Sequence, residues 1–104
     1  MVRITVLLAA ACLASAGAAA QTNDLVAYQG TNAIRLTDTA CTDAAVLERI
    51  EPEARPYFRQ ARATVDGKSY RACWGALPMA VVLVYEDGDQ GMLPLSALQK
   101  PVDI

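Results

Sequence analysis

Histidine is absent from this chain of 104 residues, and aromatic residues are few. Without histidine, neither Ser-His-Asp nor Cys-His catalysis is possible, and the commonest general base and zinc ligand are missing. An enzyme built from this sequence would have to use carboxylates, tyrosine or lysine. No cofactor is expected.

Long apolar runs are also lacking, except at the N-terminus. Arg3 is followed by residues 4–14, which are apolar apart from Thr5, and then by small residues up to Ala20. A basic start, a short apolar stretch and small-x-small triplets are typical of a cleaved secretion signal, and a membrane-spanning helix needs about 20 apolar residues. We therefore expect a signal peptide over residues 1–20, and a single periplasmic or secreted domain over residues 21–104 that has no membrane span.

Cys12 offers an alternative to cleavage after Ala20. It follows two alanines in a loose likeness of a lipobox, with Ala9 where leucine is favoured. In that case the protein would be a lipoprotein acylated at Cys12.

Basic residues are too few for general binding to nucleic acid. Loss of residues 1–20 removes Arg3 and leaves 8 basic against 11 acidic residues, a net charge of −3. Binding to the phosphate backbone needs a surplus of Lys and Arg. A protein of the cell envelope is the expected kind of partner.

Two cysteines remain in the expected domain, Cys41 and Cys73. An even number in an exported chain indicates a disulfide, and only one pairing within the chain is possible. Closing this loop of 33 residues would stabilise the fold by ~3.7 kcal/mol in the chain-entropy model. A redox pair is the alternative, but such pairs usually have Cys-x-x-Cys spacing.

The first half of the domain predicts a hairpin followed by a short helical region. Turn-forming residues separate two β-prone runs, Asp43 is placed to cap a helix, and Pro52 would end that helix. A second helical turn is expected to start near Pro56. The expected elements are strands over 25–28 and 33–37, a helix over 43–51 and a turn within 53–60.

The second half predicts further antiparallel strands. Asp66-Gly67 lies between two alternating runs, which is the sequence of a two-residue hairpin. In the second run Tyr70, Ala72 and Trp74 would share one face, so Cys73 would point to the other face, toward Cys41.

The run over 79–85 is apolar at successive positions, which favours a strand covered on both faces. A turn over 86–91 and a short strand over 92–95 follow it, and Pro94 marks that strand as an edge. A helical turn over 96–99 and a loose tail over 101–104 would end the chain. The fold class predicted is α+β: a small antiparallel meander of about five or six strands with one helix, a short helical turn and one disulfide.

The acidic turn over 86–91 is the one candidate for ion chemistry. Asp87 and Asp89 are spaced like the first ligands of a calcium loop, but later positions lack the bidentate glutamate. An ordinary polar hairpin turn would have the same composition. Glu86 with Asp87 or Asp89 would be the acid/base pair of a small hydrolase.

Three arginines and one tryptophan are candidates for a binding surface. Arg55, Arg59 and Arg62 are spaced to form a basic stripe if one helix contains them. A solvated face is the alternative. Trp74 would be either an exposed binding anchor or a core residue packed beside Cys73.

Several segments together resemble short exported proteins encoded by proteobacteria and their prophages. They are LTDTAC at residues 36–41, ARATVDG at 61–67, CW at 73–74 and VYEDGDQG at 84–91. The resemblance implies a Gram-negative periplasm and no particular mechanism.

Small size, export, a disulfide and the missing catalytic groups favour a non-enzymatic binding or inhibitory module of the bacterial envelope. A phage-related accessory factor that modulates lysis or superinfection is one alternative. A small carboxylate-dependent hydrolase is the other.

Overall fold

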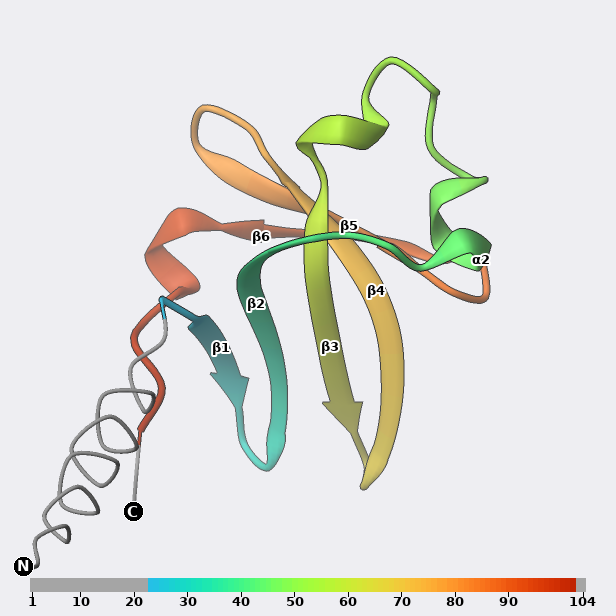
Figure 1. The fold of residues 1–104 in the computed structure, drawn as a ribbon. Helices are drawn as coiled ribbons and strands as arrows, with labels where there is room; N and C mark the ends of the chain where they lie inside the picture. The colour runs from blue at the N-terminus through green and yellow to red at the C-terminus, as the bar shows by residue number, and fades with distance from the viewer. Residues whose placement is uncertain (1–22, 103–104) are drawn as a thin grey trace, which may run out of the picture.

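Six antiparallel strands form one sheet, in the order of the chain, in the computed structural model, which describes residues 23–102 (Figure 1). The strands are β1 (Leu25–Gln29), β2 (Asn32–Ala40), β3 (Arg59–Val65), β4 (Lys68–Ala76), β5 (Ala80–Tyr85) and β6 (Gln90–Pro94). The helical elements are short: α2 (Ala44–Leu47), η2 (Arg55–Tyr57) and η3 (Leu95–Ala97). The expected meander with little helix is confirmed. The expected signal over 1–20, Cys12 and the last two residues lie outside the described residues.

The turn between β3 and β4 forms as its sequence predicts. Asp66 and Gly67 both have positive φ, 52° and 79°, and Val65 pairs with Lys68 on either side of them. A type I′ turn needs positive φ at both central residues, and its twist matches that of the strands. This turn fixes the register between β3 and β4.

The helix expected over 43–51 is shorter than predicted. Asp43 caps it as expected, because its side chain accepts a hydrogen bond from the backbone N–H of Ala45, but α2 ends at Leu47. The next two bonds, from Arg49 to Val46 and from Ile50 to Leu47, span three residues instead of four. Pro52 has no N–H with which to continue the helix, so the chain tightens and brings Ile50 back to the sheet.

The sheet curls, so that β5 and β6 cross behind β2, β3 and β4 (Figure 1). An inner cluster between these layers contains Leu36, Ala61, Ala72, Val81 and Leu83 as its buried members. An outer cluster under α2 contains Cys41, Val46, Ile50, Cys73 and Val84. β5 supplies both clusters, which confirms the prediction that this strand is covered on both faces.

The disulfide joins β4 to the end of the first hairpin. Cys41 and Cys73 are bonded, with their Cα atoms 5.8 Å apart, in the outer cluster. Ala72 and Trp74 lie on the other face, in or against the inner cluster. The predicted alternation of β4 is therefore confirmed, together with the pairing of the two cysteines.

The chain after the last strand returns to β1 through Gln99, a contact that the sequence did not predict. After η3, the backbone N–H and C=O of Gln99 bond to Val26 of β1 at 2.9 and 2.8 Å. The tail is also less loose than expected, because the N–H of Val102 donates to the hydroxyl of Tyr28. β6 keeps an edge, and Pro94 lies on it as predicted. No helix within residues 23–102 is long and apolar enough to cross a membrane.

Candidate functional site

The predicted basic stripe does not form. Arg55 lies on η2, where its Nε donates to the carbonyl of Ile50 at 2.9 Å. Arg59 and Arg62 lie on β3 and are three residues apart, so they point to opposite faces of the sheet. The condition for that stripe, one helix containing all three arginines, is not met, because the helical turn ends before Arg59, where β3 begins.

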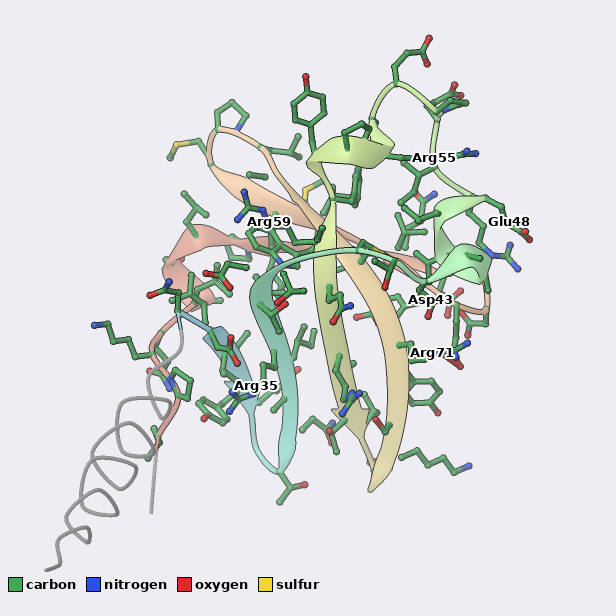
Figure 2. The ribbon with its side chains drawn as sticks, viewed as in Figure 1. Arg35, Asp43, Glu48, Arg55, Arg59 and Arg71 are labelled. Carbon is green, nitrogen blue, oxygen red and sulfur yellow. A yellow bond between two sulfur atoms is a disulfide. The ribbon has the colours of Figure 1, made fainter. Side chains whose placement is uncertain are left out.

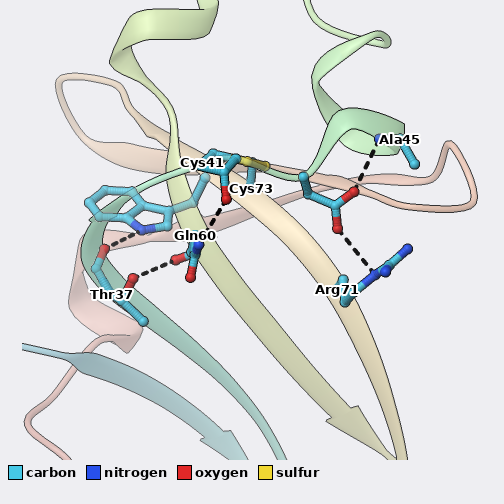
Figure 3. The surroundings of a disulfide bond; sticks show 9 residues. Thr37, Cys41, Ala45, Gln60, Arg71 and Cys73 are labelled. Atoms are coloured by element: carbon cyan, nitrogen blue, oxygen red, sulfur yellow. Dashed lines mark hydrogen bonds and ion pairs between the residues drawn. A yellow bond between two sulfur atoms is a disulfide. The ribbon is translucent and has the colours of Figure 1, made fainter.

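Of the two alternatives predicted for Trp74, the structure shows the residue that packs on the core. Its ring packs against the inner cluster, and its indole Nε1 donates to the carbonyl of Thr37 at 2.8 Å (Figure 3). A large ring that is half-buried and has its one donor satisfied is a packing residue. It ties β4 to β2 across β3.

The acidic turn joins β5 to β6 and has the geometry of a closed hairpin. The N–H of Asp89 donates to the side chain of Asp87 at 2.9 Å, and the N–H of Tyr85 donates to the carbonyl of Asp89 at 2.8 Å. Gly88 has φ +95°, which a larger residue would adopt only with strain. No group of three or more metal-ligating side chains occurs in the part of the chain that the structure describes. A cation site at Asp87 and Asp89 remains a prediction.

Glu86 is directed away from the two aspartates. Its carboxylate accepts hydrogen bonds from the backbone N–H of Arg71 at 3.1 Å and from the Nε of Arg71 at 2.7 Å. Arg71 also contacts Asp43, so Glu86 belongs to the face of the sheet that bears α2. Asp87 and Asp89 are left without Glu86 as a partner.

The two aspartates instead border a hollow on the inner face of the sheet. We call it the tyrosine pocket; its volume is about 230 Å³, and it is lined by Ala63, Val65, Tyr70, Tyr85, Asp87 and Asp89. Ala63 and Tyr70 are directly opposite each other on β3 and β4, and Tyr85 is opposite Ala72. Strand pairing thus places two tyrosines in this pocket, and the turn after β5 adds the two carboxylates.

The tyrosine pocket has a negative potential. Burial first, and then the charges of Asp87 and Asp89, raise the pKa of Tyr85 above its ordinary value. A nearby anion disfavours the tyrosinate form in the same way that it favours a bound cation. The pocket is therefore suited to a positively charged group.

An apolar hollow adjoins the tyrosine pocket and shares Val65 with it. Its volume is about 410 Å³, and Ala27, Ile34, Leu93 and Ala97 are among its lining residues. Both hollows lie on the inner side of the sheet, because Ile34 and Leu93 pack against the inner cluster.

Sequence reasoning found the two aspartates and missed the tyrosines. The alternation of β4 puts Tyr70 on the face of Ala72 and Trp74, so its direction was readable from the sequence. The shared pocket of Tyr70 and Tyr85 could not be predicted in this way, since it depends on the register between β4 and β5. Comparison with protein-family models, curated proteins and solved structures finds no match.

Proposed function

We propose that this protein is an exported, non-enzymatic binding module, and that its tyrosine pocket binds a lysine or arginine side chain of a protein partner in the cell envelope. The observation behind the proposal is the placement of two carboxylates, Asp87 and Asp89, beside two tyrosines in one hollow. An inhibitory role would follow if the bound residue belongs to the active site of an enzyme.

The chemistry of the pocket favours a cationic side chain. Tyrosine faces attract ammonium and guanidinium groups by about 0.5–2 kcal/mol, and carboxylates add charge-assisted hydrogen bonds. The volume of about 230 Å³ is below the ~300–1,000 Å³ of sites for small molecules. One side chain is therefore a better fit than a whole metabolite.

The adjoining apolar hollow supports a protein as the source of that side chain. Because it shares Val65 with the tyrosine pocket, a peptide could place an apolar residue there while its basic residue enters the pocket. Interfaces commonly combine a desolvated apolar contact with a charged anchor.

Three features support a non-enzymatic role. The sequence has no histidine. The thiols of Cys41 and Cys73 are joined. The carboxylate of Glu86 accepts hydrogen bonds from Arg71, which disfavours its use with Asp87 or Asp89 as the acid/base pair of a glycosidase.

NMR titration with N-acetyl-lysine amide tests the proposal, and N-acetyl-norleucine amide, its uncharged analogue, is the control ligand. We expect saturable shifts at Tyr70 and Tyr85 with the lysine compound only. The double variant Asp87→Asn/Asp89→Asn should lose them, whereas Glu53→Gln, which alters an exposed carboxylate outside the pocket, should retain them. Equal shifts with both ligands, or unchanged shifts in the double variant, would contradict the proposal.

A carbodiimide cross-link identifies the partner. This reagent joins a carboxylate to a lysine amine in direct contact, so mass spectrometry of the envelope fraction should find Asp87 or Asp89 bonded to a lysine of another protein. Cross-links confined to carboxylates outside the pocket would count against the site.

A further inference from the structure

Three arginines lie side by side on the outer face of the sheet, the face opposite the tyrosine pocket. We call them the arginine row: Arg35 on β2, Arg62 on β3 and Arg71 on β4. Arg35 is directly opposite Arg62, and Arg62 is directly opposite Arg71. Arg35 and Arg71 are labelled on either side of β3 in Figure 2.

The pairing brings these like charges close together. The carbonyl of Arg71 accepts a hydrogen bond from the N–H of Glu86, so its backbone groups point to β5 and not to β3. Arg62 and Arg71 therefore form a non-hydrogen-bonded pair, whose Cα atoms are about 4.5 Å apart in antiparallel sheets. Like charges directly opposite each other destabilise a sheet unless something balances them.

Carboxylates balance the two outer members of the row. Arg35 contacts Asp24 at 2.7 Å, while Arg71 contacts Glu86 at 2.7 Å and Asp43 at 3.1 Å. The other oxygen of Asp43 accepts from the N–H of Ala45.

The central member, Arg62, has no such partner among residues 23–102. No hydrogen bond or ion pair found within residues 23–102 includes the guanidinium of Arg62. The side chain is exposed, so its five N–H donors are available to a ligand.

Two hollows lie beside Arg62. One, of about 400 Å³, is shared with Arg71 and bordered by Thr42 and Asp43; the other, of about 200 Å³, is shared with Arg35 and bordered by Thr37. Gln60 lines both, and its amide donates to the hydroxyl of Thr42 at 3.4 Å (Figure 3). The hydroxyl of Thr37 already donates to the carbonyl of Gln60, and the carboxylate of Asp43 borders the larger hollow. The donors available in this space are therefore chiefly those of Arg62 itself.

We infer that the arginine row binds a phosphate group over Arg62. Guanidinium groups match the oxygens of phosphate in pairs, and one phosphate presents enough oxygens to accept from two neighbouring arginines at once. A bound dianion would also remove the repulsion between the paired arginines. The site is independent of the tyrosine pocket, because it lies on the other face of β3 and β4.

Thermal unfolding at pH 7 in sodium phosphate, compared with sodium chloride at the same ionic strength, tests the site. We expect phosphate to raise the Tm by about 6–11 °C at roughly ten times its Kd. Arg62→Thr should have a higher Tm than the natural protein in chloride, because the repulsion is gone, and should show no rise specific to phosphate. Arg62→Gln, which keeps a long side chain, should behave in the same way.

Arg59→Thr is the matched control, since Arg59 lies on the same strand and points to the other face. It should keep the phosphate-specific rise. Three results would overturn the inference. Phosphate does not raise the Tm of the natural protein, the rise in Tm persists in both Arg62 variants, or the rise in Tm is lost in Arg59→Thr.

Two further ligands separate the sources of the phosphate group. Binding to vesicles of phosphatidylcholine with phosphatidylglycerol that is lost in Arg62→Thr indicates a lipid headgroup. Stabilisation by glycerol 3-phosphate without vesicle binding indicates a soluble phosphate ester. The inference fails if neither ligand shows an effect that depends on Arg62.

Discussion

Single residues set the electrostatic character of the tyrosine pocket. Tyr85 is half-buried, and the carboxylates of Asp87 and Asp89 lie in the same pocket. Its hydroxyl is therefore a probe of the potential that a bound cation would experience. On the opposite face, Arg35 and Arg71 form ion pairs, whereas Arg62 forms none within residues 23–102.

Stability should fall at high pH because of Tyr85. Its pKa is raised in the folded protein, so the unfolded chain loses this proton first, and the folded state becomes less favourable as pH increases. Stability is fully present below the ordinary pKa of tyrosine, about 10, and is lost as pH rises toward the folded pKa.

Urea unfolding between pH 8 and 11 measures this effect. Tyr85→Phe should flatten the decline, whereas Tyr57→Phe, at a side chain that is 77% exposed, should leave it unchanged. A decline of the same slope in Tyr85→Phe would mean that other groups cause it.

At the scale of elements, the helical segment between β2 and β3 covers the outer face through a close fit. Gly75 of β4 lies under the ring of Phe58, and a Cβ at this position would be 3.0 Å from the ring. Glycine is therefore required here for space and not for an unusual φ. The ring in turn packs against the cluster that contains the disulfide.

Gly75→Ala should destabilise the fold by about 1–3 kcal/mol, because the added methyl group displaces the ring of Phe58. Chemical denaturation measures the change. In the background of Phe58→Leu the same substitution should cost much less, and this coupling distinguishes a steric clash from a loss of backbone freedom. Equal costs in both backgrounds would contradict the contact.

At the scale of elements, local interactions account for the segments that the sequence predicted correctly. Asp66-Gly67 determines its hairpin locally, since both residues accept positive φ. The helix expected up to residue 51 was too long, because Ile50 is drawn into the outer cluster by tertiary packing. The basic stripe does not form for a related reason: the spacing of the arginines would place them on one face only in a helix, and β3 begins at Arg59.

At the scale of the whole molecule, closure of the curled sheet depends on one residue after the last strand. Val26 is 2% exposed, and both its backbone bonds on this side are made with Gln99. The contact holds β1 near η3, beside the apolar hollow lined by Ala27 and Ala97.

Gln99→Pro removes the N–H that donates to the carbonyl of Val26. Leaving that buried carbonyl without a partner should cost about 1–3 kcal/mol. Gln99→Ala, which keeps the backbone bond, should change stability by no more than about 0.5 kcal/mol. Hydrogen exchange at the amide of Val26 should become faster in the proline variant alone; unchanged exchange would show that closure does not depend on this contact.

The sequence by itself determined the strands, most of their turns and the disulfide, because alternation, turn chemistry and an even cysteine count act over a few residues or leave one choice. It also placed Asp87 and Asp89 together on one turn. Only the tertiary structure decided that the sheet curls and meets at Gln99, that Tyr70 and Tyr85 share a pocket, and that three arginines align across β2, β3 and β4. These arrangements depend on strand register and sheet twist, which arise from packing between residues far apart in the chain.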